Sequence, residues 1–252
     1  MDFQEKNVLI TGGSRGIGRA TAQAFAERGA RVAINFQSDH QAATATIESL
    51  AGDGHFAVRA DLSRPEAVEQ MINATVEEFG RLDILVNNAG IYQQHRLPDV
   101  TYEEWQKAWQ DTLNINLVGA ANTTYWAARH MISTGGGRIV NVSSRGAFRG
   151  EPDHPAYAAS KAALNAMGQS LAQSLAPYHI FVGTVAPGFV ETDMAKDRLE
   201  GPLGESIRQQ SPIGRVAQPW EVALGILFLA SEGTEFMTGT ILDINGASYL
   251  RS

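Results

Sequence analysis

Short apolar runs alternate with longer stretches of helical periodicity, and this restricts the fold of the chain more than any other feature. Several of the runs are continuously apolar, which is typical of strands covered by helices on both faces. Alternation of this kind indicates repeated βαβ units around a parallel sheet. The sequence therefore predicts an α/β protein with a central, buried sheet. The predicted strands are Val8–Thr11, Arg31–Phe36, Phe56–Ala60, Leu82–Asn87, Gly137–Val142, Ile180–Ala186 and Thr240–Ile244.

Signals for the start of helices fall between these strands. Ser63 with Glu66, and Thr101 with Glu104, both fit a capping box. Pro219 is expected to open the last helix. A chain of 252 residues with 44% apolar residues, and with no visible linker or repeat, fits one domain of this class. We therefore predict a single domain over residues 1–252.

Charge and composition exclude several function classes. The chain has 27 acidic and 20 basic residues, so its net charge of −7 provides no basic field for a nucleic acid. It has no cysteine, which excludes disulfides and thiolate metal sites, and no metal is expected. The first residues lack a signal-peptide pattern, and the longest apolar run, Val222–Ala230, is under half of the roughly 20 residues that cross a bilayer. We expect a soluble cytoplasmic protein without a membrane partner.

A glycine-rich segment joins the first predicted strand to a strong helix former. Its spacing, TGxxxGxG from Thr11 to Gly18, differs from the GxGxxG fingerprint of dinucleotide sites. Glycines here let the backbone approach a pyrophosphate, whose charge lies at the helix N-terminus. An ordinary strand-to-helix turn is the alternative, because glycine is the default turn residue. The dinucleotide-binding residues predicted in this segment are Gly12, Ser14, Arg15, Gly16, Ile17 and Gly18.

The same segment also matches GxSxG, the nucleophile elbow of α/β hydrolases, with Ser14 as the serine. Such an elbow needs an oxyanion-hole loop from an earlier strand, and only one predicted strand precedes Ser14. An Asp and a His that share its pocket would also have to follow in order. The position of the motif therefore argues against a hydrolase.

The end of the second predicted strand bears on the choice of dinucleotide. NAD-binding units usually place Asp or Glu there to accept from the ribose 2′-hydroxyl, whereas this chain has Asn35. A carboxylate would repel a 2′-phosphate, and an amide would not. Arg15 is placed to form a charge-assisted bond with such a phosphate, although a solvated arginine at a helix start is the alternative. The sequence favours NADP(H) over NAD(H).

Three residues after the fifth predicted strand form a candidate catalytic group. Ser144 follows that strand, and Tyr157 and Lys161 share one helix face because they are four residues apart. Lowering a tyrosine pKa from near 10 to about 7 takes roughly 4 kcal/mol, which one cation about 4 Å away supplies at an effective dielectric constant of 20. We predict Tyr157 as the acid/base, Lys161 as the group that lowers its pKa, and Ser144 as the hydrogen-bond donor to the substrate oxygen. Taken alone, such a pair is more often a packed aromatic beside a solvated lysine.

Further segments accompany these motifs in chain order: Asp61-Leu62, Asn87-Asn88-Ala89-Gly90, Asn116-Leu117 and Pro187-Gly188-Phe189-Val190-Glu191-Thr192. Together with the glycine segment and the Ser, Tyr and Lys group, they resemble the short-chain dehydrogenase/reductase family over nearly the whole chain. The resemblance implies a doubly wound Rossmann fold with a seven-stranded parallel sheet. It also implies an oxidoreductase acting on CH–OH with a nicotinamide cofactor, and a homotetramer.

The resemblance further implies roles for individual residues. Asn116 would join the catalytic group as a fourth member, with its carbonyl holding a water that relays protons to Lys161. Each of the cofactor residues alone also fits an ordinary turn or surface position. The implied cofactor contacts are Asp61 and Leu62 at the adenine, Asn88, Ala89 and Gly90 along the ribose, and Val190 and Thr192 at the nicotinamide, with Pro187 and Gly188 in the same turn.

The segment 189–216 mixes apolar and polar residues with several Gly and Pro. This composition is typical of a mobile lid over a substrate, with a poorly ordered surface loop as the alternative. The helix after Tyr157 is rich in Ala, Gly and Ser, which lets another helix approach closely. We expect an oligomer built partly on this face.

Within the family, the 3-oxoacyl-acyl-carrier-protein reductases are the most similar subgroup. Such reductases tend to meet their acidic carrier with basic residues, where this chain has Ser133–Gly136 and Ala176–His179. Because this surface would steer an acidic carrier poorly, we favour a small-molecule alcohol or ketone and keep the carrier substrate as the alternative. Arg145, Arg149 and His154 are interpreted as solvated loop charges, with contacts to a polar or anionic substrate as the alternative. A catalytically silent dinucleotide-binding sensor or scaffold is the alternative from another class.

Overall fold

One seven-stranded sheet forms the centre of the protein, and all neighbouring strands run parallel in the order β3-β2-β1-β4-β5-β6-β7. The computed structural model describes residues 1–251. The strand order reverses between β1 and β4, and ligands of open α/β sheets bind beyond the carboxyl ends of the strands at such a point. The strands are β1 (Asn7–Ile10), β2 (Arg31–Phe36), β3 (Phe56–Arg59), β4 (Ile84–Asn87), β5 (Gly137–Val142), β6 (Ile180–Pro187) and β7 (Ile241–Ile244).

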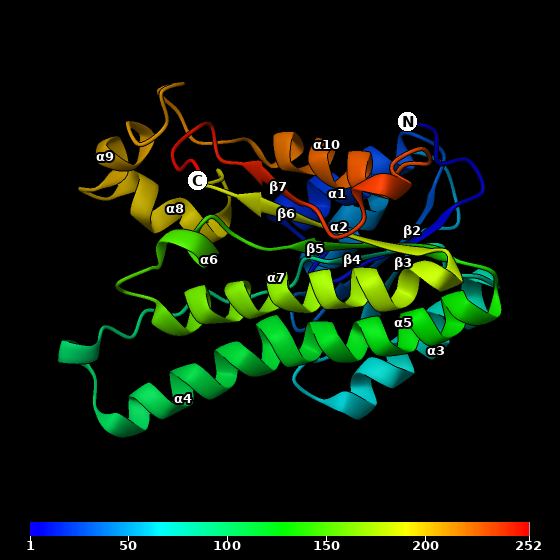
Figure 1. The fold of residues 1–252 in the computed structure, drawn as a ribbon, viewed down its shortest axis with the longest axis horizontal. Helices are drawn as coiled ribbons and strands as arrows, with labels where there is room; N and C mark the ends of the chain where they lie inside the picture. Colours follow the sequence, from blue (N-terminus) through cyan, green and yellow to red (C-terminus); the bar gives the residue numbers. More distant parts are fainter. Residues whose placement is uncertain (252) are drawn as a thin grey trace.

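Helices cover both faces of the sheet (Figure 1). Val8 and Ile10 of β1 pack against α1, α2 and α10, whereas Leu9 between them packs against α3, α5 and α7, as the two-residue repeat of a strand requires. Within residues 1–251, no helix combines the length and apolar character that a membrane span requires. The helices are α1 (Gly16–Ala26), α2 (His40–Glu48), α3 (Pro65–Phe79), α4 (Tyr102–Leu113), α5 (Ala120–Ser133), α6 (Gly146–Arg149), α7 (Pro155–Leu175), α8 (Asp193–Glu200), α9 (Gly204–Arg208) and α10 (Pro219–Ala230).

The predicted fold is confirmed, and every predicted strand agrees with the structure to within two residues at either end. Thr101 and Glu104 form the predicted capping box, and Pro219 is the first residue of α10. The capping box predicted at Ser63 is wrong. The backbone N–H and the hydroxyl of Ser63 both donate to the Asp61 carboxylate, at 2.9 and 2.7 Å, and α3 begins later without a side-chain cap.

The segment 189–216 forms a small unit of its own at one end of the molecule, where α8 and α9 lie near α6 (Figure 1). A single parallel bridge between Val190 and Ala217 joins its two ends. Its helices pack through a separate apolar cluster, which the main core does not include. The segment also contacts the rest of the protein near its end, where Gln210 accepts from Arg145 and Ser211 donates to the carbonyl oxygen of Gly246 at 2.7 Å. The cluster comprises Ala195, Leu199, Ile207 and Val216, with Phe189 packed against it.

Candidate active site

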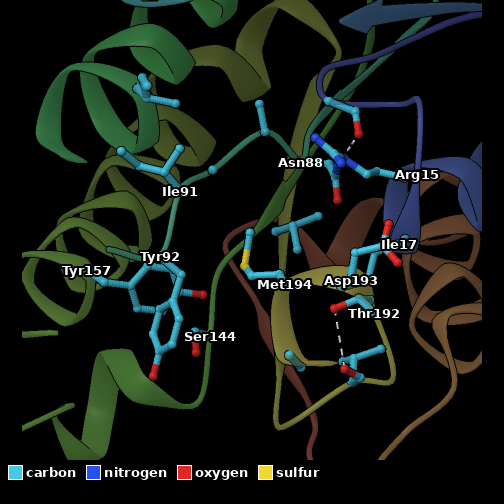
Figure 2. Close-up of a pocket in the computed structure, with 18 of the residues that line it drawn as sticks. Arg15, Ile17, Asn88, Ile91, Tyr92, Ser144, Tyr157, Thr192, Asp193 and Met194 are labelled. Carbon is cyan, nitrogen blue, oxygen red and sulfur yellow. Dashed lines mark hydrogen bonds between the residues drawn. The ribbon is translucent and has the colours of Figure 1, made fainter. Parts of the chain in front are cut away.

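A cavity of about 600 Å³ lies at the carboxyl ends of the central strands. Figure 2 shows Tyr157 and Ser144 on one side of it and Arg15 and Ile17 on the other, with Met194 of α8 between them. No group of His, Asp or Glu within residues 1–251 is arranged to hold a metal ion. The sequence-predicted residues that line the cavity are Gly12, Ser14, Arg15, Gly16, Ile17, Asn35, Asp61, Leu62, Asn88, Ala89, Gly90, Ser144, Tyr157, Lys161, Pro187, Gly188, Val190 and Thr192.

Backbone geometry explains the glycines of the loop between β1 and α1. Gly12 has a φ of 62°, in the left-handed region that favours glycine. A Cβ on Gly18 would lie 2.3 Å from the carbonyl oxygen of Gly12, so this glycine serves packing rather than lining the cavity. The amide of Asn88 fixes the loop by donating to the carbonyl oxygens of Thr11 and Gly12 at 2.9 and 3.0 Å. The N-terminus of α1 has no side-chain cap and faces the cavity, an arrangement that suits a pyrophosphate.

Asn35 has a role that differs from the one expected. Its side chain is 2% exposed, and its amide nitrogen donates to the carbonyl oxygen of Ala60 at 3.1 Å. Its side-chain oxygen accepts from the backbone N–H of Gly12 at 3.4 Å. Asn35 therefore ties β2 to the glycine loop and to the end of β3. The positions after β2 that line the cavity are residues 37–39.

Asp39 places a carboxylate near the end of β2, which the sequence argument missed. Its side chain accepts from the backbone N–H of Ala42 at 3.0 Å and caps α2. The positive end of the helix dipole offsets this carboxylate. Arg15 is exposed and lines the same end of the cavity, so this end carries one arginine and one carboxylate held by a helix.

Tyr157 lies in the first turn of α7 and faces the cavity beside Ser144 (Figure 2). Burial raises the pKa of Tyr157 to about 12, the hydrogen bond with Ser144 acts to lower it, and the charge of Glu151 acts to raise it. The phenol is therefore neutral at neutral pH, which is the form that gives a proton to a developing alkoxide. The backbone N–H of Gly146 donates to Oγ of Ser144 at 3.0 Å and holds the serine at the start of α6.

Lys161 follows one turn later on α7 and is buried. Its Nζ donates to the carbonyl oxygen of Val142 at 2.7 Å and lies 5.7 Å from the centroid of the Tyr157 ring. The four-residue spacing thus brings the two side chains to one place, as predicted. Burial lowers the pKa of Lys161 to about 8. The sequence predicts that the pKa of Tyr157 lies below its usual value. Burial has the larger effect here and raises that pKa instead.

Asn116 lies in a π-helical turn, Asn114–Gly119, between α4 and α5. Its buried side chain accepts from the backbone N–H of Ile91 at 2.8 Å and donates to the carbonyl oxygen of Ile91 at 3.0 Å. It also donates to Oγ of Ser160 at 3.2 Å. Asn116 therefore holds the loop after β4 against α7 without lining the cavity. Turns of this kind are frequent at functional sites, but sequence periodicity does not reveal them.

The far end of the cavity is formed by residues that sequence reasoning missed, among them Tyr92, Glu151 and Arg198. The Tyr92 ring stacks on the ring of His154, with centroids 3.7 Å apart, and meets the Tyr157 ring edge-on at 4.7 Å. Arg198 of α8 donates to the hydroxyl oxygen of Tyr92 at 2.5 Å. The hydroxyl of Tyr92 donates to the Glu151 carboxylate at 3.4 Å. Tyr92 thus links the segment 189–216 to the wall beside Tyr157.

The loop before α7 corrects one expectation. Arg149 is exposed, as predicted, but Arg145 and His154 are buried, so their interpretation as solvated charges is wrong. The guanidinium of Arg145 is covered because it donates to side chains that come much later in the chain, Gln210 and Ser248. Burial lowers the pKa of His154 to about 4, so the ring that stacks on Tyr92 is neutral at neutral pH.

Comparisons with known proteins agree over almost the whole chain. A family model described as "Enoyl-(Acyl carrier protein) reductase" matches residues 12–247. The 3-oxoacyl-[acyl-carrier-protein] reductase FabG of Staphylococcus aureus (strain Mu50) is 37% identical over 247 residues, which are 97% of this chain and 98% of that protein. The FabG of Vibrio cholerae is 38% identical over 250 residues, which are 99% of this chain and 100% of that protein.

The fold agrees with solved structures as well. A short chain dehydrogenase from Burkholderia cenocepacia J2315, solved in complex with NADP, has a TM-score of 0.88 and 36% identity, covering 98% of this chain and 99% of that one. These matches argue against the interpretation of Ser14 as the nucleophile of a hydrolase. The chain belongs to the short-chain dehydrogenase/reductase family and is an oxidoreductase that acts on CH–OH groups with NAD or NADP.

Proposed function

We propose that this protein interconverts a secondary alcohol and a ketone on a small molecule, with NADP(H) as its cofactor. The supporting observation is that one cavity contains both the glycine loop at the start of α1 and the Ser144–Tyr157 pair. The bound cofactor supplies or accepts the hydride. In ketone reduction, Ser144 donates a hydrogen bond to the carbonyl oxygen and Tyr157 gives it a proton. Lys161 provides the buried positive charge beside them, and Asn116 positions the loop after β4.

The residues present fit the cofactor on structural grounds. The uncapped N-terminus of α1 suits a pyrophosphate, and the loop passes too close to Gly18 for any larger residue. Hydrogen bonds from Ser63 lower the pKa of Asp61, so an ionised carboxylate is available to the adenine. Asn88, Ala89 and Gly90 are proposed to border the ribose. Pro187, Gly188, Val190 and Thr192 are proposed to border the nicotinamide.

The choice of NADP(H) over NAD(H) is tested by Arg15→Gln. We expect the KM for NADPH to rise roughly 10-fold or more, because a hydrogen bond to a charged group is worth about 1.5–3 kcal/mol. The KM for NADH is expected to change little, since NADH has no 2′-phosphate. Steady-state kinetics with both cofactors measures the effect. Arg19→Gln, on the same helix but outside the cavity lining, is the matched control.

Two outcomes would contradict this choice of cofactor. One is a wild-type protein with the higher kcat/KM for NADH. The other is an Arg15→Gln variant that loses affinity for both cofactors to the same degree, because the arginine would then contact only what the two cofactors share.

The alternative substrate is a 3-oxoacyl group on an acyl carrier protein, which the similarity to the FabG proteins favours. The segments Ser133–Gly136 and Ala176–His179, at the ends of α5 and α7, carry no Lys or Arg to attract an acidic carrier. The test compares NADPH oxidation with acetoacetyl-acyl-carrier protein and with a panel of small ketones. We expect kcat/KM for the best small ketone to equal or exceed that for the carrier substrate. A preference of about 100-fold for the carrier, close to 3 kcal/mol, would select the alternative.

We also infer that the segment 189–216 acts as a lid over the substrate. Phe189, Met194 and Arg198 of this segment line the cavity, and Arg198 contacts Tyr92, which supports this role. The homotetramer remains a prediction for this chain. Exposed apolar side chains on α5 and α10, including Tyr125 and Phe228, are compatible with helix packing between copies.

A further inference from the structure

Arg145, next to the catalytic serine, is a buried cation without an anionic partner. Its side chain is 2% exposed. Nη1 donates to Oγ of Ser248 at 2.6 Å, and Nη2 donates to the side-chain oxygen of Gln210 at 2.9 Å. Both acceptors are neutral, and no carboxylate within residues 1–251 forms an ion pair with this guanidinium. The ring of Phe189 covers it at 5.4 Å.

This arrangement is costly unless an anion joins it. Arginine stays protonated in proteins, so the charge cannot be relieved by losing a proton. An unpaired charge removed from water costs several kcal/mol, and neutral acceptors recover only part of that free energy. Burial and the neighbouring Arg149 act to lower the pKa of Arg145, and Glu151 acts in the opposite direction without reaching ion-pair distance. The fold therefore maintains a buried positive charge at this position with Glu151 as a nearby carboxylate but without a direct ion pair.

Arg145 lies between two cavities. Arg145 lines the cavity that contains Ser144 and Tyr157. It also lines a second cavity of about 210 Å³ between the end of the segment 189–216 and the loop after β7. Phe189 is shared by both cavities in the same way. Arg145 thus belongs to the wall that separates the cavity of Ser144 and Tyr157 from the second cavity.

A second guanidinium lies at the same end of the cavity. Arg198 is 27% exposed at its side chain and lines the cavity. Arg198 forms a long ion pair with Asp153, at 3.9 Å. Asp153 also pairs with Arg96, at the shorter distance of 3.2 Å. Through Nη1, Arg198 also donates to the neutral hydroxyl of Tyr92. It therefore has donor capacity left for a ligand in the cavity.

The substrate end of the cavity carries a net charge of about +1 when the charged side chains around it are summed. Three cations line this end, Arg145, Arg198 and Lys161, against the Glu151 carboxylate in the lining and the Asp153 carboxylate that pairs with Arg198. The other lining carboxylates belong to the cofactor end: Figure 2 shows Asp193 beside Ile17 and the start of α1. A ligand with one negative charge would balance the substrate end.

We propose that the substrate is a short oxo acid or hydroxy acid, whose carboxylate binds Arg145, with Arg198 of the lid as the second donor. The assignment rests on the proposed ketone and alcohol chemistry at Tyr157 and names the substrate class for it. The carbonyl group lies at Ser144 and Tyr157, and the carboxylate lies toward Phe189. Thioesters and esters of the same acids lack the charge that the site requires.

The first test compares acids with their neutral esters on the wild-type protein. Initial rates of NADPH oxidation are measured with 2-oxobutanoate, 3-oxobutanoate, 4-oxopentanoate and 5-oxohexanoate, and with the methyl ester of each. At least one acid is expected to have a kcat/KM roughly 30-fold or more above that of its ester, as for other desolvated charge pairs. Reduction of the esters as fast as the acids throughout the series would overturn the proposal and leave ketone reduction itself intact.

The second test uses Arg145→Met, Arg145→Lys and, as the matched control, Arg149→Met on the exposed side of the same loop. Arg145→Met is expected to lower kcat/KM for the preferred acid roughly 30-fold or more, mainly through KM, and to change that of the ester less than about threefold. Arg145→Lys is expected to lie between wild type and Arg145→Met, and Arg149→Met to match wild type. Equal losses for acid and ester would assign Arg145 a structural role and contradict the proposal. If Arg145→Met does not fold, the lysine variant and the wild-type comparison decide.

A binding measurement tests the anion site separately from the proposed ketone reduction. If no ketone in either series is reduced, the proposed function is wrong, and binding then tests the anion site alone. The thermal unfolding temperature of the NADPH-bound wild type is measured with each acid and each ester. Stabilisation by an acid but not by its ester supports the site, and equal shifts reject it.

Discussion

Replacing Tyr157 by Phe is expected to reduce kcat for ketone reduction roughly 10²–10⁴-fold, the range that general acid–base catalysis supplies. The change removes one oxygen and keeps the ring that meets Tyr92 edge-on. In the wild type, burial raises the pKa of Tyr157 to about 12. The phenol is therefore protonated at neutral pH and can donate its proton. Without it, water would have to supply the proton. Stopped assays of NADPH oxidation at substrate saturation measure the loss.

Binding of the cofactor separates this mechanism from its rivals. The variant is expected to bind NADPH within about twofold of wild type, as followed by the fluorescence of the reduced nicotinamide. Tyr178→Phe, an exposed tyrosine outside the cavity lining, is the matched control and is expected to behave as wild type. Full turnover in Tyr157→Phe would contradict the proposed mechanism. A wild type that binds NADPH and reduces nothing would favour the sensor or scaffold instead.

The strands were predictable because each is a local property of the chain. A continuously apolar run such as Val8–Ile10 is buried on both faces, so neighbouring helices do not change its assignment. Helix starts depend on finer competition between side chains. Ser63 fits a cap by spacing, but the Asp61 carboxylate, two residues earlier, accepts both of its donors. That competition is invisible to a pattern that considers only the Ser and the Glu.

The site was predictable where spacing along one element fixes geometry. Tyr157 and Lys161 share a helix face for that reason, and the structure places them together. The substrate end depends instead on contacts between distant segments. Arg198 meets Tyr92, 106 positions away, and Arg145 meets Ser248, 103 positions away. No local pattern encodes such contacts, so the sequence predicts a solvated arginine at position 145, where the structure has a buried one.

Replacing Lys161 by Met is expected to lower kcat for ketone reduction roughly 100-fold or more, because the site loses its buried positive charge while keeping a side chain of similar length. The change also leaves the carbonyl oxygen of Val142 without its donor, at a cost of about 1–3 kcal/mol in stability. Thermal unfolding and NADPH binding therefore accompany the rate measurement. Lys107→Met removes an exposed lysine paired with Asp111 on α4 and is expected to keep wild-type activity.

The pH profile distinguishes loss of the charge from loss of packing. Burial lowers the pKa of Lys161 from 10.5 to about 8, so its ammonium is present below that pH and is lost above it. Wild-type kcat for ketone reduction is therefore expected to be level around neutral pH and to fall above about pH 8. Lys161→Met has no such proton to lose, so its lower rate is expected to stay level across the same range. If the variant still declines above pH 8, another group controls the alkaline limb, and the buried ammonium is not the charge on which the proton transfer depends.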